Sequence, residues 1–318
     1  MASSELAAPA AVAALPSYRE AIALDREFVP AAPPARSGMF DHIARRALEV
    51  LGADPAFERL GLRPRHRGEL TRSRPRALLR AALTARPPGP LPHEAVPLLD
   101  ALLGGLRRGR RIIDPARLPD IAETLGVTVD PEATRVVLWR GDITDITADA
   151  IVNAASNTLL GCFQPGHVCI DNAVHSAAGP RLREDCFTVA ELTGTPEYAG
   201  SAKITRGYHL SARYVVHAVG PVVEDTPLPR HRDELAAAYR SSLDLAASFG
   251  AIRTVALSPI SQGDFALPRA ETGRIAVRTV AEWIQTHPGR FDRVVFDVCG
   301  DEDYRQYTRH LGEWPAPH

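Results

Sequence analysis

The stretch that decides the fold is "DAIVNAASNTLLGCFQPGHVCIDNAVHSAAG", residues 149–179. It opens with a short apolar run, continues through a loop of small and polar residues, and ends in apolar residues spaced every three to four positions. A short apolar run is typical of a buried strand, and three- to four-residue spacing is typical of an amphipathic helix. The stretch therefore predicts a strand, a loop and a helix in that order.

The same alternation continues along the C-terminal part of the chain. Further β-branched runs are "TRVVLWR" (134–140), "ARYVVHAVG" (212–220), "IRTVALSPI" (252–260) and "FDRVVFDVCG" (291–300). Helical patterns cover "IDNAVHSAAGPRLREDC" (170–186), residues 232–250, residues 270–288 and residues 301–311. Strands that alternate with helices predict an α/β fold, with a mostly parallel sheet between two helical layers.

The N-terminal part has a different texture. Residues 1–38 are rich in Ala and Pro, which predicts a loosely ordered tail with one short helix. Residues 39–130 show helical spacing between Pro-rich breaks, which predicts a helical N-terminal region. Its arginines are typical of a solvated surface, with a phosphate- or partner-binding surface as the alternative. The α/β unit is expected over residues 131–318.

Composition excludes several classes of protein. The chain has 318 residues, 45% of them hydrophobic, and a formal net charge of −1, so no global field favours nucleic acid or anionic membrane. It contains no apolar run of about 20 residues that could span a bilayer. The N-terminus has no basic segment and carries Glu5, which argues against a signal peptide. Four cysteines are too few for a disulfide framework, so we expect a reducing, cytoplasmic setting.

Three loops follow predicted strands, where parallel sheets bind their ligands. The first contains Gly141 and Asp142, the second contains Asn153 and Asn157, and the third is "SPISQGDFALP" (258–268). Each alone is compatible with an ordinary turn. Together they suit a ligand that combines adenine, ribose and diphosphate, because a Ser/Gly loop before a helix can hold phosphate.

Cys162, His167 and Cys169 form a C-x4-H-x-C pattern in the second of these loops. Thiolates and an imidazole are zinc ligands, and three of them leave a coordination position open. A redox pair usually has C-x-x-C spacing, and a purely buried role for both thiols is unusual in a Gly/Pro-rich loop. Cys186 could complete a four-ligand site, although its helical setting favours an inward-facing core position.

The segments "GDIT", "DAIVNAASN", "LLG" and "IDNAVHSAAG", with Ser261, Gly263 and Phe265, resemble the macrodomain family over residues 131–311. The insert "GCFQPGHVC" resembles the zinc-containing macrodomains, which are bacterial, sirtuin-linked protein-ADP-ribose hydrolases. One departure is that the family usually has Asn-Ala-Ala-Asn, whereas here Ser156 takes the fourth position and Asn157 follows.

The resemblance implies roles at the matching positions. Zn²⁺ would be the cofactor, held by Cys162, His167 and Cys169, and the catalytic candidates are Asp171, Asn157 and Ser156. The candidate ADP-ribose-binding residues are Asp142, Ile143, Asn157, Ile170, Asp171, Asn172, Ser261, Gln262, Gly263, Asp264 and Phe265.

The expected reaction is hydrolysis of mono-ADP-ribose from an acidic side chain of a target protein. Its oxocarbenium-like transition state would be stabilised by nearby negative charge, with Asp171 as base or as ribose ligand. The alternative is a non-catalytic ADP-ribose reader in which zinc braces the loop. The resemblance further implies a lipoyl-carrier protein as partner, modified by a sirtuin-like ADP-ribosyltransferase.

Overall fold

The computed structural model describes residues 9–52, 74–126, 130–194, 196–260 and 267–314. Its six strands are β1 (Val136–Arg140), β2 (Ala150–Ala155), β3 (Ala202–Arg206), β4 (Tyr214–Val219), β5 (Thr254–Leu257) and β6 (Arg293–Val298). They form one sheet in the order β1-β6-β5-β2-β4-β3. Neighbouring strands are parallel except for the antiparallel pair β3 and β4, so the predicted mostly parallel sheet is confirmed.

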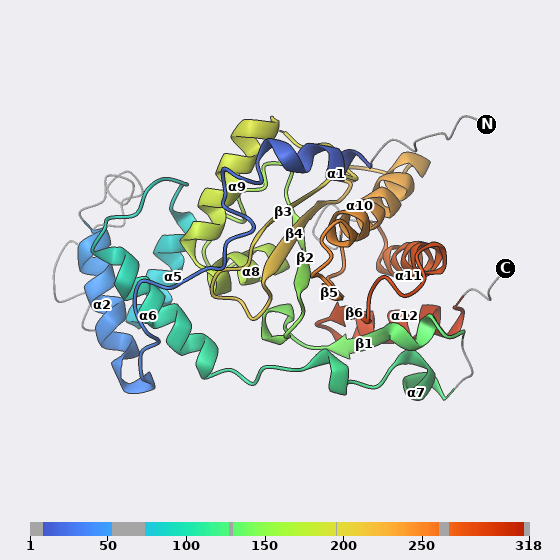
Figure 1. Cartoon of the computed structure of the whole chain (residues 1–318), viewed down its shortest axis with the longest axis horizontal. Helices are drawn as coiled ribbons and strands as arrows, with labels where there is room; N and C mark the ends of the chain where they lie inside the picture. The colour runs from blue at the N-terminus through green and yellow to red at the C-terminus, as the bar shows by residue number, and fades with distance from the viewer. Residues whose placement is uncertain (1–8, 53–73, 127–129, 195, 261–266, 315–318) are drawn as a thin grey trace.

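Helices cover the sheet on both sides (Figure 1). The helices α8 (Ile170–Ala178) and α9 (Pro180–Thr193) lie on one face, and α10 (Pro229–Ala247), α11 (Arg269–Thr286) and α12 (Asp301–Gly312) lie on the other. The result is the expected three-layer α/β/α arrangement. Among the described residues, no helix combines the length and the apolar character needed to cross a membrane.

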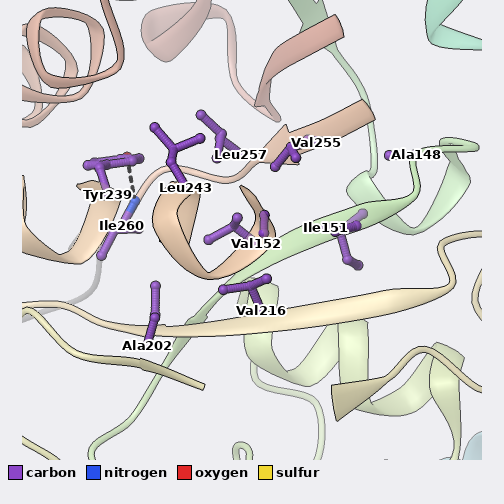
Figure 2. Close-up of a cluster of buried hydrophobic side chains, with 14 of the residues drawn as sticks. Ala148, Ile151, Val152, Ala202, Val216, Tyr239, Leu243, Val255, Leu257 and Ile260 are labelled. Atoms are coloured by element: carbon purple, nitrogen blue, oxygen red, sulfur yellow. Dashed lines mark hydrogen bonds between the residues drawn. The ribbon is translucent and has the colours of Figure 1, made fainter. Parts of the chain in front are cut away.

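The core between the sheet and α10 fixes the carboxyl end of β5. Figure 2 shows Leu243 and Tyr239 of α10 facing side chains of β2 and β5. The Tyr239 hydroxyl accepts a hydrogen bond of 3.1 Å from the backbone N–H of Ile260. This bond anchors the first residues of the third predicted ligand loop, which follows β5.

The edge strand β3 lies outside the predicted strands. Its sequence "AKITR" contains Lys203 and Arg206, which interrupt the apolar pattern. Lys203 is nevertheless buried, because its ammonium group lies 2.6 Å from the carboxylate of Glu197. At this position of β3 a buried ion pair stands where a buried strand usually has an apolar side chain.

The helix predicted over residues 170–186 is two helices. Gly179 separates α8 from α9 with φ of 93°, a left-handed conformation that glycine adopts without steric cost. Pro180 follows as the first residue of α9, where its missing N–H breaks no hydrogen bond.

The prediction of a loosely ordered tail over residues 1–38 is wrong for its described part. The segment that contains α1 (Ala10–Ala14) lies along α10, and its apolar side chains belong to the main core. Tyr18 is fully buried, and its hydroxyl accepts a hydrogen bond of 3.2 Å from the N–H of Ile204 in β3. The Ala-rich composition of this segment therefore does not indicate its actual role, which is to pack against the core and cover the edge strand β3.

The helical region has a small core of its own. It contains α2 (Phe40–Leu51), α5 (Pro75–Ala85) and α6 (Ala95–Arg108), which pack together and lie beside α8 and α9 in Figure 1. The short helix α7 (Ile121–Leu125), in contrast, contributes Ile121 to the main core beside β1. The predicted domain limits at residues 38 and 130 stay predictions.

Candidate functional site: a Cys-His cluster at the carboxyl end of the sheet

Three metal-ligating side chains meet in the loop between β2 and α8. One ligand atom each from Cys162, His167 and Cys169 lies within 4.8 Å of the other two. The Cys162 Sγ is 3.4 Å from the His167 Nδ1. His167 is exposed and both thiols are partly exposed, so the cluster faces solvent. This arrangement has the donor chemistry of a three-ligand zinc site with an open position.

The backbone of this loop needs three left-handed residues. Leu159, Gly161 and Gly166 have φ of 62°, 81° and 81°. A Cβ on Gly161 would approach the ring of His175 to within 2.8 Å, so only glycine lets the loop pass this close to α8. Leu159 holds the same type of conformation at a steric cost, which the packing of its buried side chain offsets.

Cys169 is also the N-cap residue that precedes α8. Its Sγ accepts a hydrogen bond of 3.4 Å from the backbone N–H of Asn172, in the manner of a helix N-cap. Burial and the neighbouring Cys162 raise the pKa of the Cys169 thiol to about 11, although the Asn172 N–H opposes this shift. A cation between the two sulfurs would therefore be needed to hold both as thiolates, and the donor set fits zinc.

Asp171 is the second residue of α8, and its side chain is directed toward the sheet. Its Oδ1 accepts a hydrogen bond of 2.8 Å from the side-chain amide of Asn153 in β2. Burial raises the pKa of Asp171 to about 6, and the Asn153 hydrogen bond and Arg183 oppose the shift. The side chain keeps 11% of its surface exposed, so one edge of the carboxyl group can meet a ligand.

Asn153 and Asn172 are engaged within the protein. Asn153 is fully buried, and its side-chain amide holds Asp171. The Asn172 amide donates to the carbonyl oxygen of His167 at 2.9 Å and to that of Gln164 at 3.4 Å. Both asparagines therefore fix neighbouring groups of the cluster.

The first predicted ligand loop lies at the end of β1. Asp142 Oδ1 accepts from the backbone N–H of Thr144 at 3.0 Å and from its hydroxyl at 2.6 Å. The Asp142 side chain remains 46% exposed, and Arg110 of the linker after α6 lies 3.8 Å from it. Ile143 is buried beneath this turn, whereas Ile170 at the start of α8 is half-buried.

The remaining predicted residues divide into two groups. Ser156 and Asn157 are exposed at the end of β2, and the Ser156 hydroxyl is 3.0 Å from that of Thr158. Both are therefore accessible to a ligand at this edge. Ser261, Gln262, Gly263, Asp264 and Phe265 lie outside the described residues.

Cys186 does not join the exposed cluster. It is buried beside His217 and belongs with His175 to a second, buried Cys-His group. The expectation that Cys186 faces the core is confirmed. Cys299 directly follows β6 and is exposed.

Arg183 is a residue of this site that the sequence reasoning missed. It is buried in α9 and donates to the carbonyl oxygen of Leu160 at 2.8 Å, just before the cluster. Its position on the same helix as inward-facing Cys186, three residues away, was the available signal.

The chain is similar to known proteins along most of its length. The model of the Macro domain family matches residues 152–276. The Protein-ADP-ribose hydrolase of Staphylococcus aureus (strain COL) is 39% identical over 231 residues, which are 72% of this chain and 82% of that protein. A probable bifunctional ADP-ribose hydrolase/ADP-ribosyltransferase of Fusarium oxysporum f. sp. cubense is 40% identical over 250 residues, 74% of this chain. The chain spans only 41% of that longer relative.

Solved structures show the same fold. The Trypanosoma brucei macrodomain in complex with ADP-ribose matches with a TM-score of 0.56 and 27% identity, over 73% of this chain and 95% of that one. A mutant macrodomain of Oceanobacillus iheyensis matches with a TM-score of 0.51 and 31% identity, over 56% of this chain and 91% of that one.

Proposed function

This chain belongs to the macro domain family, and on that premise we propose that it is a protein-ADP-ribose hydrolase. The observation that carries the proposal is that the potential ligand atoms of Cys162, His167 and Cys169 lie close together. Asp171 follows Cys169 by two residues, so a carboxyl group stands next to this cluster in the chain. The names of the relatives support the reaction class. The substrate would be a protein that carries mono-ADP-ribose on an acidic side chain.

The ligand would lie along the carboxyl edge of the sheet. Asp142 would accept a hydrogen bond from the adenine amine, since its carboxylate is half-exposed at the end of β1. The distal ribose would reach the exposed end of β2, where Ser156 and Asn157 offer a hydroxyl and an amide. Ser261–Phe265 remain the proposed residues for the diphosphate.

The reaction at the distal ribose would depend on two charged groups, the zinc ion and the carboxylate of Asp171. Zinc held by the cluster would supply a Lewis acid that orients and polarises the ribose, its own charge being compensated by two thiolates. Asp171, fixed by Asn153, would accept a hydrogen bond from a ribose hydroxyl or take the proton of the attacking water. A carboxylate at this position also stabilises the positive charge that develops on the ribose.

The proposed function also implies a target protein and an enzyme that attaches the ADP-ribose to it. The resemblance to zinc-containing macrodomains suggests a lipoyl-carrier protein as target, with a sirtuin-like ADP-ribosyltransferase as the opposing enzyme. The Fusarium relative, whose name combines the two activities, supports the idea of a reversible modification.

The test measures ADP-ribose released from a protein that carries the modification on acidic side chains. We expect release by the zinc-loaded chain and little release by Cys162→Ala, His167→Ala or Cys169→Ala. His42→Ala is the matched control, because His42 is an exposed histidine of α2. Full turnover by all three metal-free variants would overturn the role of zinc.

A second function is favoured by one observation. Ser156 stands where the family usually has asparagine, so the ribose contact differs from that of the family pattern. Binding of ADP-ribose without any release by the zinc-loaded chain would identify a reader instead of a hydrolase.

A further inference from the structure

The end of α5 contacts the Cys-His loop through one buried arginine. Arg183 donates from Nη1 to the carbonyl oxygens of Leu83 and Thr84 at 3.0 Å each, and to that of Arg86 at 2.5 Å. These carbonyls lie at the C-terminal end of α5, where a helix has no intrahelical donors left and attracts a cation. The same guanidinium donates from Nε to Leu160, two residues before Cys162.

The guanidinium also contacts the interior of the loop. Its central carbon lies 4.4 Å from the centre of the Phe163 ring, a cation–π geometry. Phe163 follows Cys162 directly, so Arg183 touches the chain on both sides of the first ligand.

A second route joins α5 to the same loop. The buried Thr84 hydroxyl donates to Asn172 Oδ1 at 3.4 Å. The Asn172 amide in turn donates to the carbonyl of His167, the second ligand, and its backbone N–H donates to the Sγ of Cys169, the third. All three ligands therefore have a neighbour that is held by the end of α5.

We propose that α5 acts through Arg183 and Asn172 to position the metal-binding loop, so that the helical N-terminal region is a functional part of the metal centre. This inference rests on the proposed zinc site. A loop that is already ordered loses less conformational entropy when the metal binds, which raises affinity. Partners that orient metal ligands typically contribute about 10–100-fold to affinity.

Arg181 provides a matched control on the same helix. It also joins α9 to the helical region, through an ion pair of 2.7 Å with Asp100 of α6. Among the described residues, its contacts do not include the loop from Leu160 to Cys169. A general loss of docking between the two regions would affect both arginine variants, whereas loop positioning depends on Arg183 alone.

The experiment compares Arg183→Lys, Thr84→Val and Arg181→Lys in the full chain. Zinc affinity is measured by competition with a chromogenic chelator, and Tm is measured without metal. We expect Arg183→Lys to weaken zinc binding about tenfold and Thr84→Val to weaken it by a smaller factor. Arg181→Lys is expected to bind zinc as the unchanged chain does, even where its Tm falls equally.

Hydrogen exchange of the loop amides gives a readout that needs no metal. In Arg183→Lys, the amides of residues 163, 164 and 166–168 should exchange faster than in Arg181→Lys. Equal zinc affinity and equal exchange in the two arginine variants would overturn the inference. Absence of zinc binding by the unchanged chain would overturn the proposed centre instead, and the exchange data would still decide whether α5 orders the loop.

Discussion

The side-chain amide of Asn153 donates a hydrogen bond of 2.8 Å to Asp171 Oδ1, across the gap between β2 and α8. Both residues are buried, and they are separated by the whole Cys-His loop. The bond therefore closes that loop at its two ends and sets the direction of the only carboxylate adjacent to the cluster in sequence.

The first prediction concerns this bond itself. Asn153→Leu leaves the buried carboxyl of Asp171 without its donor, which should lower the free energy of unfolding by about 1–3 kcal/mol. The double variant with Asp171→Asn should lose less than the sum of the two single variants, because the unpaired carboxyl is gone. Urea unfolding of the four proteins measures this coupling. Additivity within about 0.5 kcal/mol would show that the bond is energetically unimportant.

The second prediction separates the N-cap role of Cys169 from its proposed role as a zinc ligand. Serine keeps an N-cap acceptor for the Asn172 N–H but is a poor zinc ligand. Cys169→Ser should therefore retain the metal-free Tm and lose the stabilisation by zinc. In the unchanged chain, zinc binding should raise the free energy of unfolding by about 2.7 kcal/mol at a free zinc concentration a hundredfold above Kd. Thermal unfolding with and without zinc tests it, and equal stabilisation of both proteins would contradict the assignment of Cys169 as a ligand.

The third prediction is a dependence on pH. Burial alone would raise the pKa of Asp100, but hydrogen bonds from His209, Arg181 and the Ala31 N–H outweigh it and lower the pKa to about 2. A lowered pKa means that the contribution to stability is complete above the ordinary value of 3.8 and is lost as the pH falls towards 2. Asp100→Asn should thus cost about 2 kcal/mol at pH 6, and the cost should shrink below pH 4.

Urea unfolding at pH 6 and pH 3 measures the difference between the two proteins. Asp41→Asn is the matched control, because Asp41 forms an exposed ion pair with Arg76 in the same helical region. Such a pair contributes at most about 1 kcal/mol. A pH-independent cost of Asp100→Asn would contradict the assigned ion pairing.

The sequence predicts most of the α/β unit because its strands are continuous apolar runs and its helices keep regular spacing. It fails where a tertiary contact replaces a local signal. From the sequence alone, Lys203 is expected at the surface, whereas in the structure it is buried in an ion pair with Glu197. Likewise, the segment around Tyr18 is expected to be a loosely ordered tail, whereas it packs against the edge strand β3. In both cases the fold, and not the local sequence pattern, brings the partner into contact.

The site was predictable to a similar extent. The proposed ligand set of Cys162, His167 and Cys169 follows from residue type and spacing, and the structure brings the three side chains together. The spacing to Cys186 indicates that Arg183 faces inward, but it does not identify the acceptors, because these are backbone carbonyls as far as 100 positions earlier and carry no residue-specific signal. Such contacts depend on how the helical region packs, which local patterns do not encode.

The last prediction concerns the segment that covers the sheet edge. Tyr18→Phe removes the acceptor of the Ile204 N–H and should cost about 1–3 kcal/mol, because a buried donor is left unpaired. Tyr18→Ala also opens a cavity and should cost about 3–5 kcal/mol. Tyr198→Phe should have no effect, since Tyr198 is 59% exposed. Chemical unfolding of the three variants tests the ranking. If Tyr18→Phe were as stable as the unchanged chain, the hydroxyl would be dispensable and apolar packing alone would hold the segment. A loss of stability in both Tyr18 variants would identify this segment as the element that covers the open edge of β3.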